Sequence, residues 1–333
     1  MSAYAAAHAN PHGAGDARPT ASQIIHDQAL KNQLRGKVIV ITGATSGIGL
    51  ETARALSSTG ATLILTARNM EKGKRALGHI LEQDRIMLVQ MDLASLQSVR
   101  VGADTILSIS KSQVNILINN AGVMGLKDLQ LTEDGYEVQF VTNYLSHFLL
   151  FQLLRGALMA STTLTFHSRV VTVASSAHRS TTLNESDNYN FQKGVYSHEI
   201  AYANSNLAKV YLANEIDRRY SLNGIHATSV HPGAINTDIS RNLDRELLKH
   251  IMRNDYVLKI LKSPEQGAAT TVLAAVGKEW ENKGGRYLED CEESKRGEDD
   301  NQSFGVGYVR QTYDPILENR LWKDSLKMLG LDE

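Results

Sequence analysis

The chain has 333 residues, of which 42% are hydrophobic and 21% are charged, so it can bury a substantial core as one large domain or two small ones. Its 35 basic and 36 acidic residues give a formal net charge of -1, which offers no electrostatic basis for binding nucleic acid or an anionic membrane. The single cysteine, Cys291, excludes an intramolecular disulfide, and nothing indicates a metal cluster, so we expect a cytoplasmic protein without bound metal.

The first 20 residues are rich in Ala, Gly, His and Pro and have no hydrophobic period, so we expect residues 1–20 to form a disordered arm. They also lack the basic flank and apolar run of a signal peptide. Residues 21–34 are compatible with one short amphipathic helix. The β-branched run KVIVIT, residues 37–42, then predicts a first strand that is buried on both faces of a sheet.

Apolar runs then alternate with longer segments of helical period. Further strands are predicted near residues 62–66, 86–91, 114–119, 168–174 and 225–230. This alternation predicts an α/β fold, a Rossmann-type doubly wound parallel sheet. No repeat, linker or shift in composition divides residues 21–333, which we expect to form a single domain. The most apolar stretch, residues 148–159, is too short to span a bilayer and predicts a buried or interfacial helix.

Two connections are long for a compact domain and are expected to be inserted substrate loops. Residues 177–201 are polar, whereas residues 239–262 mix charge with Leu and Ile. The second loop has apolar residues at helical spacing, which predicts either a lid over a lipophilic ligand or a face that packs on the domain or on a second copy in a homo-oligomer. These residues are Leu243, Leu247, Leu248, Ile251 and Met252.

A glycine-rich turn, TGATSGIG, directly follows the first strand and opens a helical segment. Glycines here let the backbone approach a pyrophosphate at a helix N-terminus, where free N–H groups and the helix dipole favour negative charge. The strand before and the helix after make this signal far more specific than a glycine triplet alone. The turn therefore predicts a dinucleotide site that includes Gly43, Ser46, Gly47, Ile48 and Gly49.

The end of the second predicted strand indicates which dinucleotide is bound. Ala67 stands where an NAD-binding protein usually has an acid for the ribose 2'-hydroxyl, and Arg68 comes next. A guanidinium there can pair with a 2'-phosphate through two parallel hydrogen bonds, and Lys72 can add a second positive charge. We therefore expect NADP(H) as the cofactor. An ordinary surface arginine is the alternative.

Further motifs follow in a fixed order. Over residues 37–329 the chain resembles the short-chain dehydrogenase/reductase family, particularly its retinol-dehydrogenase-like branch. Beyond the glycine-rich turn, the matching pieces are Asp92-Leu93, Asn119-Asn120-Ala121-Gly122, Asn143, Ser175-Ser176, Tyr202, and His231-Pro232-Gly233 with Thr237.

The resemblance implies that many of these residues bind the cofactor. Asp92 would contact the adenine and Asn119 would line the adenosine ribose, and the adjoining Leu93 and Ala121 would also belong to the cofactor site. The segment after the sixth predicted strand would wrap the nicotinamide through Pro232, Gly233, Ile235 and Thr237. Taken singly, structural roles stay open, because Asp92 could cap a helix and a Pro-Gly pair could form a plain turn.

The resemblance also implies the catalytic roles. Tyr202 would donate a proton to the substrate oxygen, Ser176 would hold that oxygen, and Asn143 would hold a water through which the proton is replaced. Ser176 closes an apolar strand and Tyr202 opens a long helical segment, so both should lie at the carboxyl edge of the sheet. His147 and His178 are expected to be ordinary core or surface residues.

The chain departs from the family at the lysine that follows the catalytic tyrosine. Asn206 occupies the lysine position beside the cofactor, and Lys209 stands three residues later. At about 100° per residue these positions lie roughly 60° apart on one helix face, so Lys209 could reach back by one turn. Otherwise Lys209 is a solvated helix residue. A tyrosine without a nearby ammonium is a poor base but still a proton donor, which favours the reductive direction.

The predicted function is NADPH-dependent reduction of a carbonyl group on a lipophilic or polycyclic small molecule, or the reverse alcohol oxidation. Two alternatives remain open. An NADP-binding enzyme of the same fold could catalyse a non-redox isomerisation or cyclisation with Tyr202 as acid or base. A non-catalytic protein could bind a cofactor or a partner.

Overall fold

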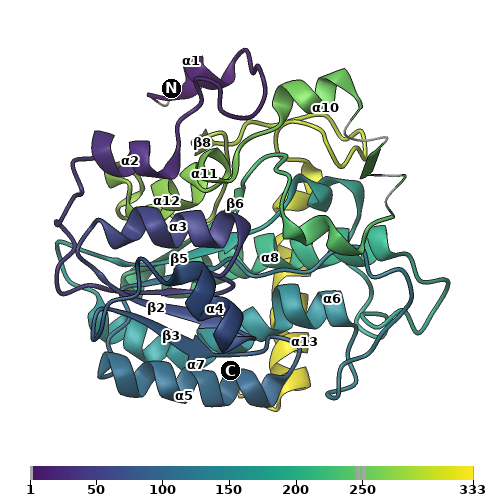
Figure 1. The fold of residues 1–333 in the computed structure, drawn as a ribbon. Coiled ribbons are helices and arrows are strands. Elements are labelled where there is room, and N and C mark those ends of the chain that lie inside the picture. Colours follow the sequence, from purple (N-terminus) through teal and green to yellow (C-terminus); the bar gives the residue numbers. More distant parts are fainter. Residues whose placement is uncertain (1–2, 245, 247, 250–252, 333) are drawn as a thin grey trace.

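A computed structural model describes residues 3–244, 246, 248–249 and 253–332 (Figure 1). In the described part of the chain, the strands form one 8-stranded sheet with the order β3-β2-β1-β4-β5-β6-β7-β8. The strands are β1 (Val38–Ile41), β2 (Thr62–Ala67), β3 (Ile86–Gln90), β4 (Ile116–Asn119), β5 (Ser168–Val173), β6 (Ile225–His231), β7 (Arg286–Glu289) and β8 (Glu292–Glu293).

The direction of the strands determines where a ligand can bind. All neighbouring pairs from β3 to β7 are parallel, and only β7 and β8 are antiparallel. The strand order reverses between β1 and β4, which creates a crevice outside the carboxyl ends of these strands. The prediction of a single-domain, Rossmann-type doubly wound sheet is confirmed. The sequence analysis missed β7 and β8, which are short and carry charged residues.

Helices cover both faces of the sheet (Figure 1). Alternate residues of β1 point to opposite sides, so Ile39 and Ile41 join one apolar core while Val38 and Val40 join the other. The first core is covered by α2 (Ala21–Asp27), α3 (Gly47–Ser57), α11 (Pro264–Gly267) and α12 (Ala269–Val276). The second core is covered by α5 (Leu96–Ser110), α7 (Ser146–Ser161), α8 (His198–Tyr220) and α13 (Pro315–Leu329).

Shorter elements lie in the connections. The α-helices among them are α1 (Ala5–His8), α4 (Met70–Leu77), α6 (Val138–Phe140) and α10 (Asp255–Ile260), and α6 continues into a π-helical turn, η1 (Val141–Leu145). The 3-10 helices are η2 (Ser176–Ser180), η3 (Ser221–Asn223), η4 (Asp238–Asn242), η5 (Lys278–Trp280) and η6 (Arg310–Thr312).

The apolar stretch at residues 148–159 forms most of α7, and Phe148 and Phe151 on this helix are fully buried. Both rings pack against Trp322 of α13, with centroids 4.8 and 6.2 Å from the indole. Each such buried ring contributes about 1.5–3 kcal/mol, so α13 is held firmly on the domain. Of the two predicted alternatives, a buried or an interfacial helix, the structure shows the buried one. Within the residues described, no helix has the length and apolar character needed to cross a bilayer.

Residues 3–20 lie on the body of the domain, where their composition led us to expect a disordered arm. Arg18 is 4% exposed and donates hydrogen bonds to the carbonyl oxygens of Ile260 (2.8 Å) and Leu261 (2.6 Å). The side chain of Gln266 donates to the carbonyl oxygens of Asp16 and Arg18. This segment is ordered by polar contacts with residues about 240 positions away, which composition does not reveal.

The two predicted substrate loops are only partly regular. The first contains η2 and irregular turns, and α8 begins before its end, at His198. In the second, Leu243 packs so closely on Gly125 that a Cβ there would lie 2.6 Å from Leu243 Cδ2. Leu248 is half-buried. The remaining residues of the predicted stripe, Leu247, Ile251 and Met252, lie outside the described residues.

The packing of the N-terminal segment predicts a measurable contribution to stability. Replacing Arg18 with Ala removes a buried guanidinium and takes one donor from the Asp16 carboxylate and from the carbonyl groups of Ile260 and Leu261, so we expect a loss of about 3 kcal/mol in the free energy of unfolding. Urea denaturation measures this loss. The exposed Arg35→Ala variant is the control, with an expected change within about 0.5 kcal/mol. Equal, small effects of both substitutions would contradict the packing.

Candidate active site

A pocket opens at the carboxyl ends of β1, β4, β5 and β6, where the strand order reverses. Parallel strands bring the segments that follow them to the same edge of the sheet. The pocket is therefore lined by the glycine-rich turn after β1, the loops after β4 and β5, helix α8, and the segment after β6.

The glycine-rich turn has a geometry that only glycine accommodates easily. Gly43 and Gly47 have φ angles of +65° and +52°, and a Cβ on Gly49 would lie 2.3 Å from the carbonyl oxygen of Gly43. Ser46 precedes α3 without capping it through its side chain, so the helix N-terminus faces the pocket with its N–H groups available. The predicted turn residues all line the pocket: Gly43, Ser46, Gly47, Ile48 and Gly49.

Tyr202 lies in the first turns of α8 and lines the pocket. Burial raises the pKa of its phenol, and hydrogen bonds with Ser175 and Asn206 offset part of this effect. The phenol is therefore protonated at neutral pH. It can donate a proton to an oxygen atom in the pocket.

The structure places Ser175 at the position that we had assigned to Ser176. Strand β5 ends at Val173, and Ser175 precedes η2 with extended backbone, facing Tyr202 in the pocket. Ser176 is 5% exposed and is absent from the pocket lining, and its N–H donates to His231 Nδ1 (3.2 Å). Adjacent residues in extended chain point in opposite directions, so the exact end of the strand decides which hydroxyl reaches the pocket.

Lys209 is not a solvated helix residue, because it is 3% exposed and lines the pocket. Its Nζ donates to the carbonyl oxygens of Ala121 (3.2 Å), which follows β4, and of Val173 (2.9 Å), the last residue of β5. Burial lowers the pKa of this ammonium to about 7. Asn206, the residue at the usual lysine position, lines the pocket but donates its side-chain N–H to the carbonyl oxygen of Tyr202 (2.8 Å).

Asn143 lies in the π-helical turn η1 and also lines the pocket. Its Oδ1 accepts from the N–H of Val123 (2.7 Å), and its Nδ2 donates to Ser205 Oγ (2.9 Å) on α8. A Cβ on Gly122 would lie 3.3 Å from Asn143 Oδ1 and 3.7 Å from Lys209 Nζ, so both polar groups flank the same glycine. π-Helical turns of this kind often occur at functional sites.

The segment after β6 closes the pocket opposite the glycine-rich turn. A Cβ on Gly47 would lie 3.2 Å from the Cβ of Thr237, so the two segments nearly touch. Ala121, after β4, lines the pocket as predicted, as do the residues expected after β6: Pro232, Gly233, Ile235 and Thr237.

The residues predicted for the adenosine end lie outside this pocket. Arg68 is exposed directly after β2, and exposed Lys72 forms an ion pair with Asp238 (3.5 Å). Asp92 Oδ1 accepts from the N–H of Ala94 (3.0 Å), as in an Asx turn, whereas Ser95 caps the helix that follows. Leu93 and Asn119 are buried, and Asn120 rather than Asn119 lines the pocket.

The histidines close to the site behave as core residues. His147 and His178 are fully buried. Burial lowers their pKa values to about 3 and about 4, so both rings are neutral at pH 7. His147 Nδ1 donates to the carbonyl oxygen of Asn143 (2.8 Å), which helps to hold η1 in place.

The sequence analysis gave no specific site role to several residues that line the pocket. Asp238 follows Thr237, Ile239 and Arg241 begin the second predicted substrate loop, and His231 lies at the end of β6. Their position directly after the predicted Pro-Gly segment was the available signal. In the part of the chain that the structure describes, no group of three or more His, Cys, Asp or Glu residues could hold a metal ion.

A family model described as short chain dehydrogenase matches residues 37–248. The chain belongs to this family. The Penicillium roqueforti short-chain dehydrogenase/reductase prx1 is 44% identical over 330 residues, covering 99% of this chain and 96% of that protein. Retinol dehydrogenase 13 of Mus musculus is 33% identical over 306 residues, covering 90% and 86%. The crystal structure of an uncharacterized protein from Mycobacterium paratuberculosis matches with a TM-score of 0.68 and 30% identity, covering 90% and 95% of the two chains.

These similarities confirm the family and its retinol-dehydrogenase-like branch. The chain is an oxidoreductase of the short-chain dehydrogenase/reductase family, whose members bind a nicotinamide cofactor and act on small molecules. The residues present fit such a cofactor, because the glycines leave room for a pyrophosphate at the N-terminus of α3.

The buried Lys209 predicts a pH dependence of cofactor binding. Its ammonium is charged below about pH 7. The phosphates of a bound dinucleotide favour the charged form and therefore raise its pKa. Affinity for the cofactor should be highest below pH 7 and should weaken as the pH rises. The loss should be up to about tenfold for each unit by which the bound cofactor raises the pKa of Lys209.

Fluorescence titrations with NADPH and NADH between pH 6 and 9 measure this dependence. NADH lacks the 2'-phosphate, so its profile separates the titration of Lys209 from that of the cofactor. The control is Lys209→Met, which should bind with a nearly flat profile. Parallel profiles for both proteins would show that Lys209 does not respond to the cofactor.

Proposed function

We propose that this protein reduces a carbonyl group on a lipophilic or polycyclic small molecule with NADPH, or catalyses the reverse alcohol oxidation. The observation that carries the proposal is the pair formed by the protonated Tyr202 phenol and Ser175 inside the cofactor pocket. When bound, the nicotinamide supplies the hydride. The protein must then supply the proton and hold the substrate oxygen.

Tyr202 donates its phenolic proton to the carbonyl oxygen, and the Ser175 hydroxyl donates a hydrogen bond to the same oxygen. Both donors lie at the carboxyl edge of the sheet, on elements held by buried contacts. Because burial raises the pKa of Tyr202, the phenol is a better proton donor than base at neutral pH. This favours reduction over oxidation.

Lys209 takes the place of the lysine that the family carries at position 206. Its ammonium lies in the same pocket as Tyr202, with a pKa of about 7 that lets it give and regain a proton near neutral pH. Asn143 flanks the same corner of the pocket. We assign to Lys209 and Asn143 the return of a proton to Tyr202 after each turnover, with Lys209 as the charged group beside the nicotinamide ribose.

The preference for NADP(H) rests on the residues after β2. Arg68 is exposed and directly follows Ala67, which offers no carboxylate to a free 2'-hydroxyl. Lys72 lies on the first turn of α4, within reach of Asp238. A 2'-phosphate can draw Lys72 away from Asp238, because the phosphate carries more negative charge than one carboxylate.

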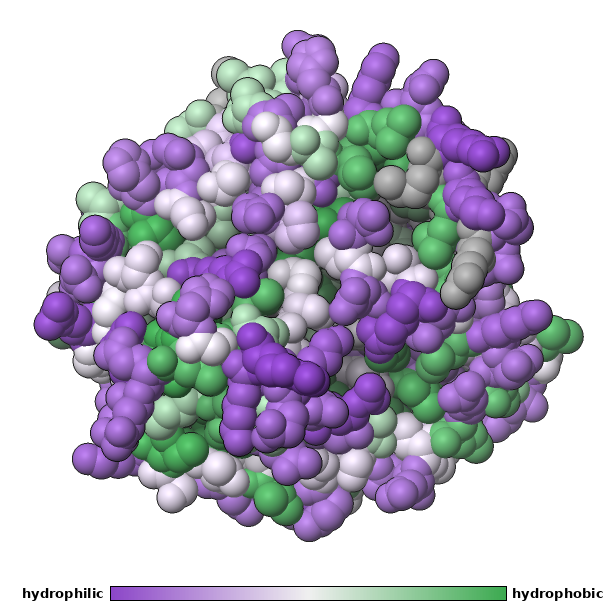
Figure 2. Space-filling model, viewed as in Figure 1, coloured by the Kyte–Doolittle hydropathy of each residue, from purple (hydrophilic) through white to green (hydrophobic). Residues whose placement is uncertain are grey.

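The proposal of an apolar substrate rests on the lid. Leu243 packs on Gly125 and lies two residues after Arg241 of the pocket lining, and Leu258 on α10 is 41% exposed. Hydrophobic side chains gather over α10 on the face drawn in Figure 2. The relative named retinol dehydrogenase 13 is named for an apolar alcohol, which supports the same substrate class.

The second candidate is a non-redox isomerisation or cyclisation on the same fold, with Tyr202 as acid or base. The replacement of the usual lysine by Asn206 favours it. Stoichiometric loss of NADPH absorbance during product formation distinguishes reduction from this alternative. The test substrates are lipophilic ketones, aldehydes and quinones.

Substitution of Tyr202 tests the catalytic assignment. Tyr202→Phe removes the donor proton and little volume, so we expect kcat to fall at least about 100-fold while the Kd for NADPH stays within about twofold. Single-turnover kinetics and fluorescence titration give the two values. Ser175→Ala should also lower kcat. Ser176→Ala, at the adjacent residue, should leave kcat nearly unchanged. Unchanged turnover in Tyr202→Phe would place the proton donor elsewhere.

Substitution of Arg68 tests the cofactor preference. Arg68→Ala should weaken NADPH binding by about 1.5–3 kcal/mol, the value of a charge-assisted hydrogen bond, and leave NADH binding nearly unchanged. NADH serves as the internal control, since it differs only at the 2' position. Equal losses for both cofactors would defeat the claim.

A further inference from the structure

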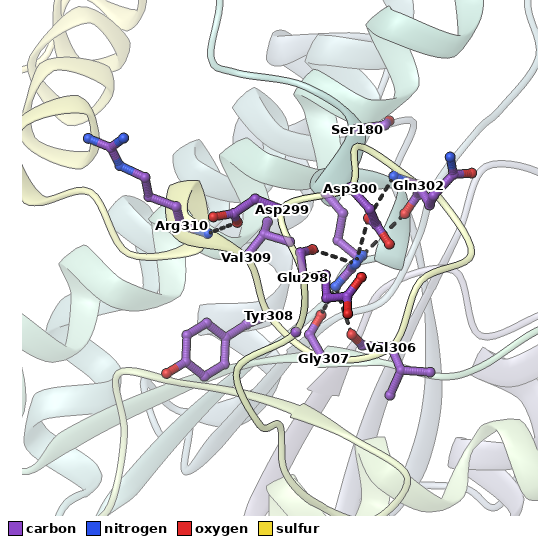
Figure 3. A network of polar contacts seen from close by, with 12 residues as sticks. Ser180, Glu298, Asp299, Asp300, Gln302, Val306, Gly307, Tyr308, Val309 and Arg310 are labelled. Carbon is purple, nitrogen blue, oxygen red and sulfur yellow. Dashed lines mark hydrogen bonds and ion pairs between the residues drawn. The ribbon is translucent and has the colours of Figure 1, made fainter.

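The segment that follows β8 wraps around η2, the short 3-10 helix that comes directly after Ser175 (Figure 3). A five-residue 3-10 helix has little stability of its own, so its position depends on tertiary contacts. The contacts come from residues 298–312, more than 115 positions later in the chain.

Arg179 on η2 is the centre of these contacts and is 1% exposed. Every N–H group of its guanidinium has a partner in this segment. Nε donates to the carbonyl oxygen of Gln302 (3.1 Å). The two terminal nitrogens donate to the carbonyl oxygens of Val306 (2.8 Å), Gly307 (2.6 Å) and Glu298 (3.0 Å), and to the carboxylate of Asp300 (2.8 Å).

Glycines let the segment close tightly around the guanidinium. A Cβ on Gly305 would lie 2.3 Å from a terminal nitrogen of Arg179, and a Cβ on Gly297 would lie 2.8 Å from the other. These distances are too short for real contacts. The backbone of residues 297–307 is therefore fitted to a side chain of η2.

A second connection joins the same segment to the residue before η2. His178 Nδ1 donates to the carbonyl oxygen of Ser175 (2.8 Å), and Nε2 is 2.9 Å from Thr312 Oγ1. A carbonyl can only accept, so the proton lies on Nδ1 and the Thr312 hydroxyl donates to Nε2. Ser175 is thus linked through His178 to η6, at the end of the wrapping segment.

We propose that Arg179 is a positioning residue for Ser175, and that the C-terminal segment 298–312 is the element that holds this serine against Tyr202. Four carbonyl groups and one carboxylate converge on the guanidinium, and no other side chain can satisfy them all. Loss of the Arg179 guanidinium removes the contacts that hold segment 298–312 and η2 against each other. The effect on turnover rests on the proposed function, since Ser175 holds the substrate oxygen there.

The test compares two buried arginines, Arg169 near the start of β5 and Arg179 on η2, which follows β5. Arg169 is 4% exposed and also donates to carbonyl oxygens, those of Ala275 and Gly277, but at the amino end of the strand. Arg179→Lys should lower kcat by about tenfold or more with an unchanged Kd for NADPH, because a shift of about 1 Å in a substrate-holding group costs rate rather than cofactor binding. Arg169→Lys should keep kcat within about twofold at a similar loss of stability.

The Ser175→Ala background shows whether the effect passes through this serine. If it does, Arg179→Lys lowers kcat no further there, within about twofold. Multiplicative losses, or an equal fall in kcat for Arg169→Lys, would overturn the proposal. If Arg179→Lys does not fold, Gly305→Ala perturbs the same contact from the other side and carries the same expectations.

Hydrogen exchange provides a readout that needs no turnover. Amides of residues 175–180 should exchange faster in Arg179→Lys than in the native protein or in Arg169→Lys. Each protein is measured at the same number of degrees below its own melting temperature. Unchanged protection of this turn overturns the proposal. Absence of NADPH-dependent turnover in the native protein refutes only the proposed function, and the exchange data then decide the positioning role.

Discussion

The site depends on one buried charge, the ammonium of Lys209. A buried ammonium is costly unless polar groups surround it, and here the carbonyl oxygens of Ala121 and Val173 do so. The first carbonyl lies just beyond β4 and the second ends β5, and both strands lie at the centre of the sheet. Lys209 therefore ties α8, the helix that also carries Tyr202, to the edge where the pocket opens.

The exchange of Asn and Lys along α8 changes how the helix presents its polar groups. Asn206 turns its amide back to the carbonyl of Tyr202, within the helix, and supplies no charge. The cation sits one turn further along, beneath the loop that contains Gly122. A longer side chain at a later position can thus reach the same pocket, because helical side chains lean toward the N-terminus.

Buried guanidinium groups hold the peripheral segments on this fold. Arg18 binds backbone carbonyls at the C-terminus of α10, Arg169 binds those at the C-terminus of α12, and Arg179 binds those after β8. Irregular segments have many backbone carbonyls that no helix or sheet satisfies, and arginine offers several donors in a rigid plane. The same chemistry thus orders the N-terminal segment, a core connection and the turn after Ser175.

The sequence alone determined six strands, the glycine-rich turn, Tyr202 and the family, because these depend on local periodicity and on short motifs. Only the tertiary structure decided that Ser175 rather than Ser176 faces Tyr202, since this depends on the residue at which β5 ends. The sequence likewise did not predict that residues 3–20 pack on the domain or that Arg179 is enclosed by residues 298–307. Their partners lie more than a hundred positions away in the chain, and no local pattern of residues records a contact over that distance.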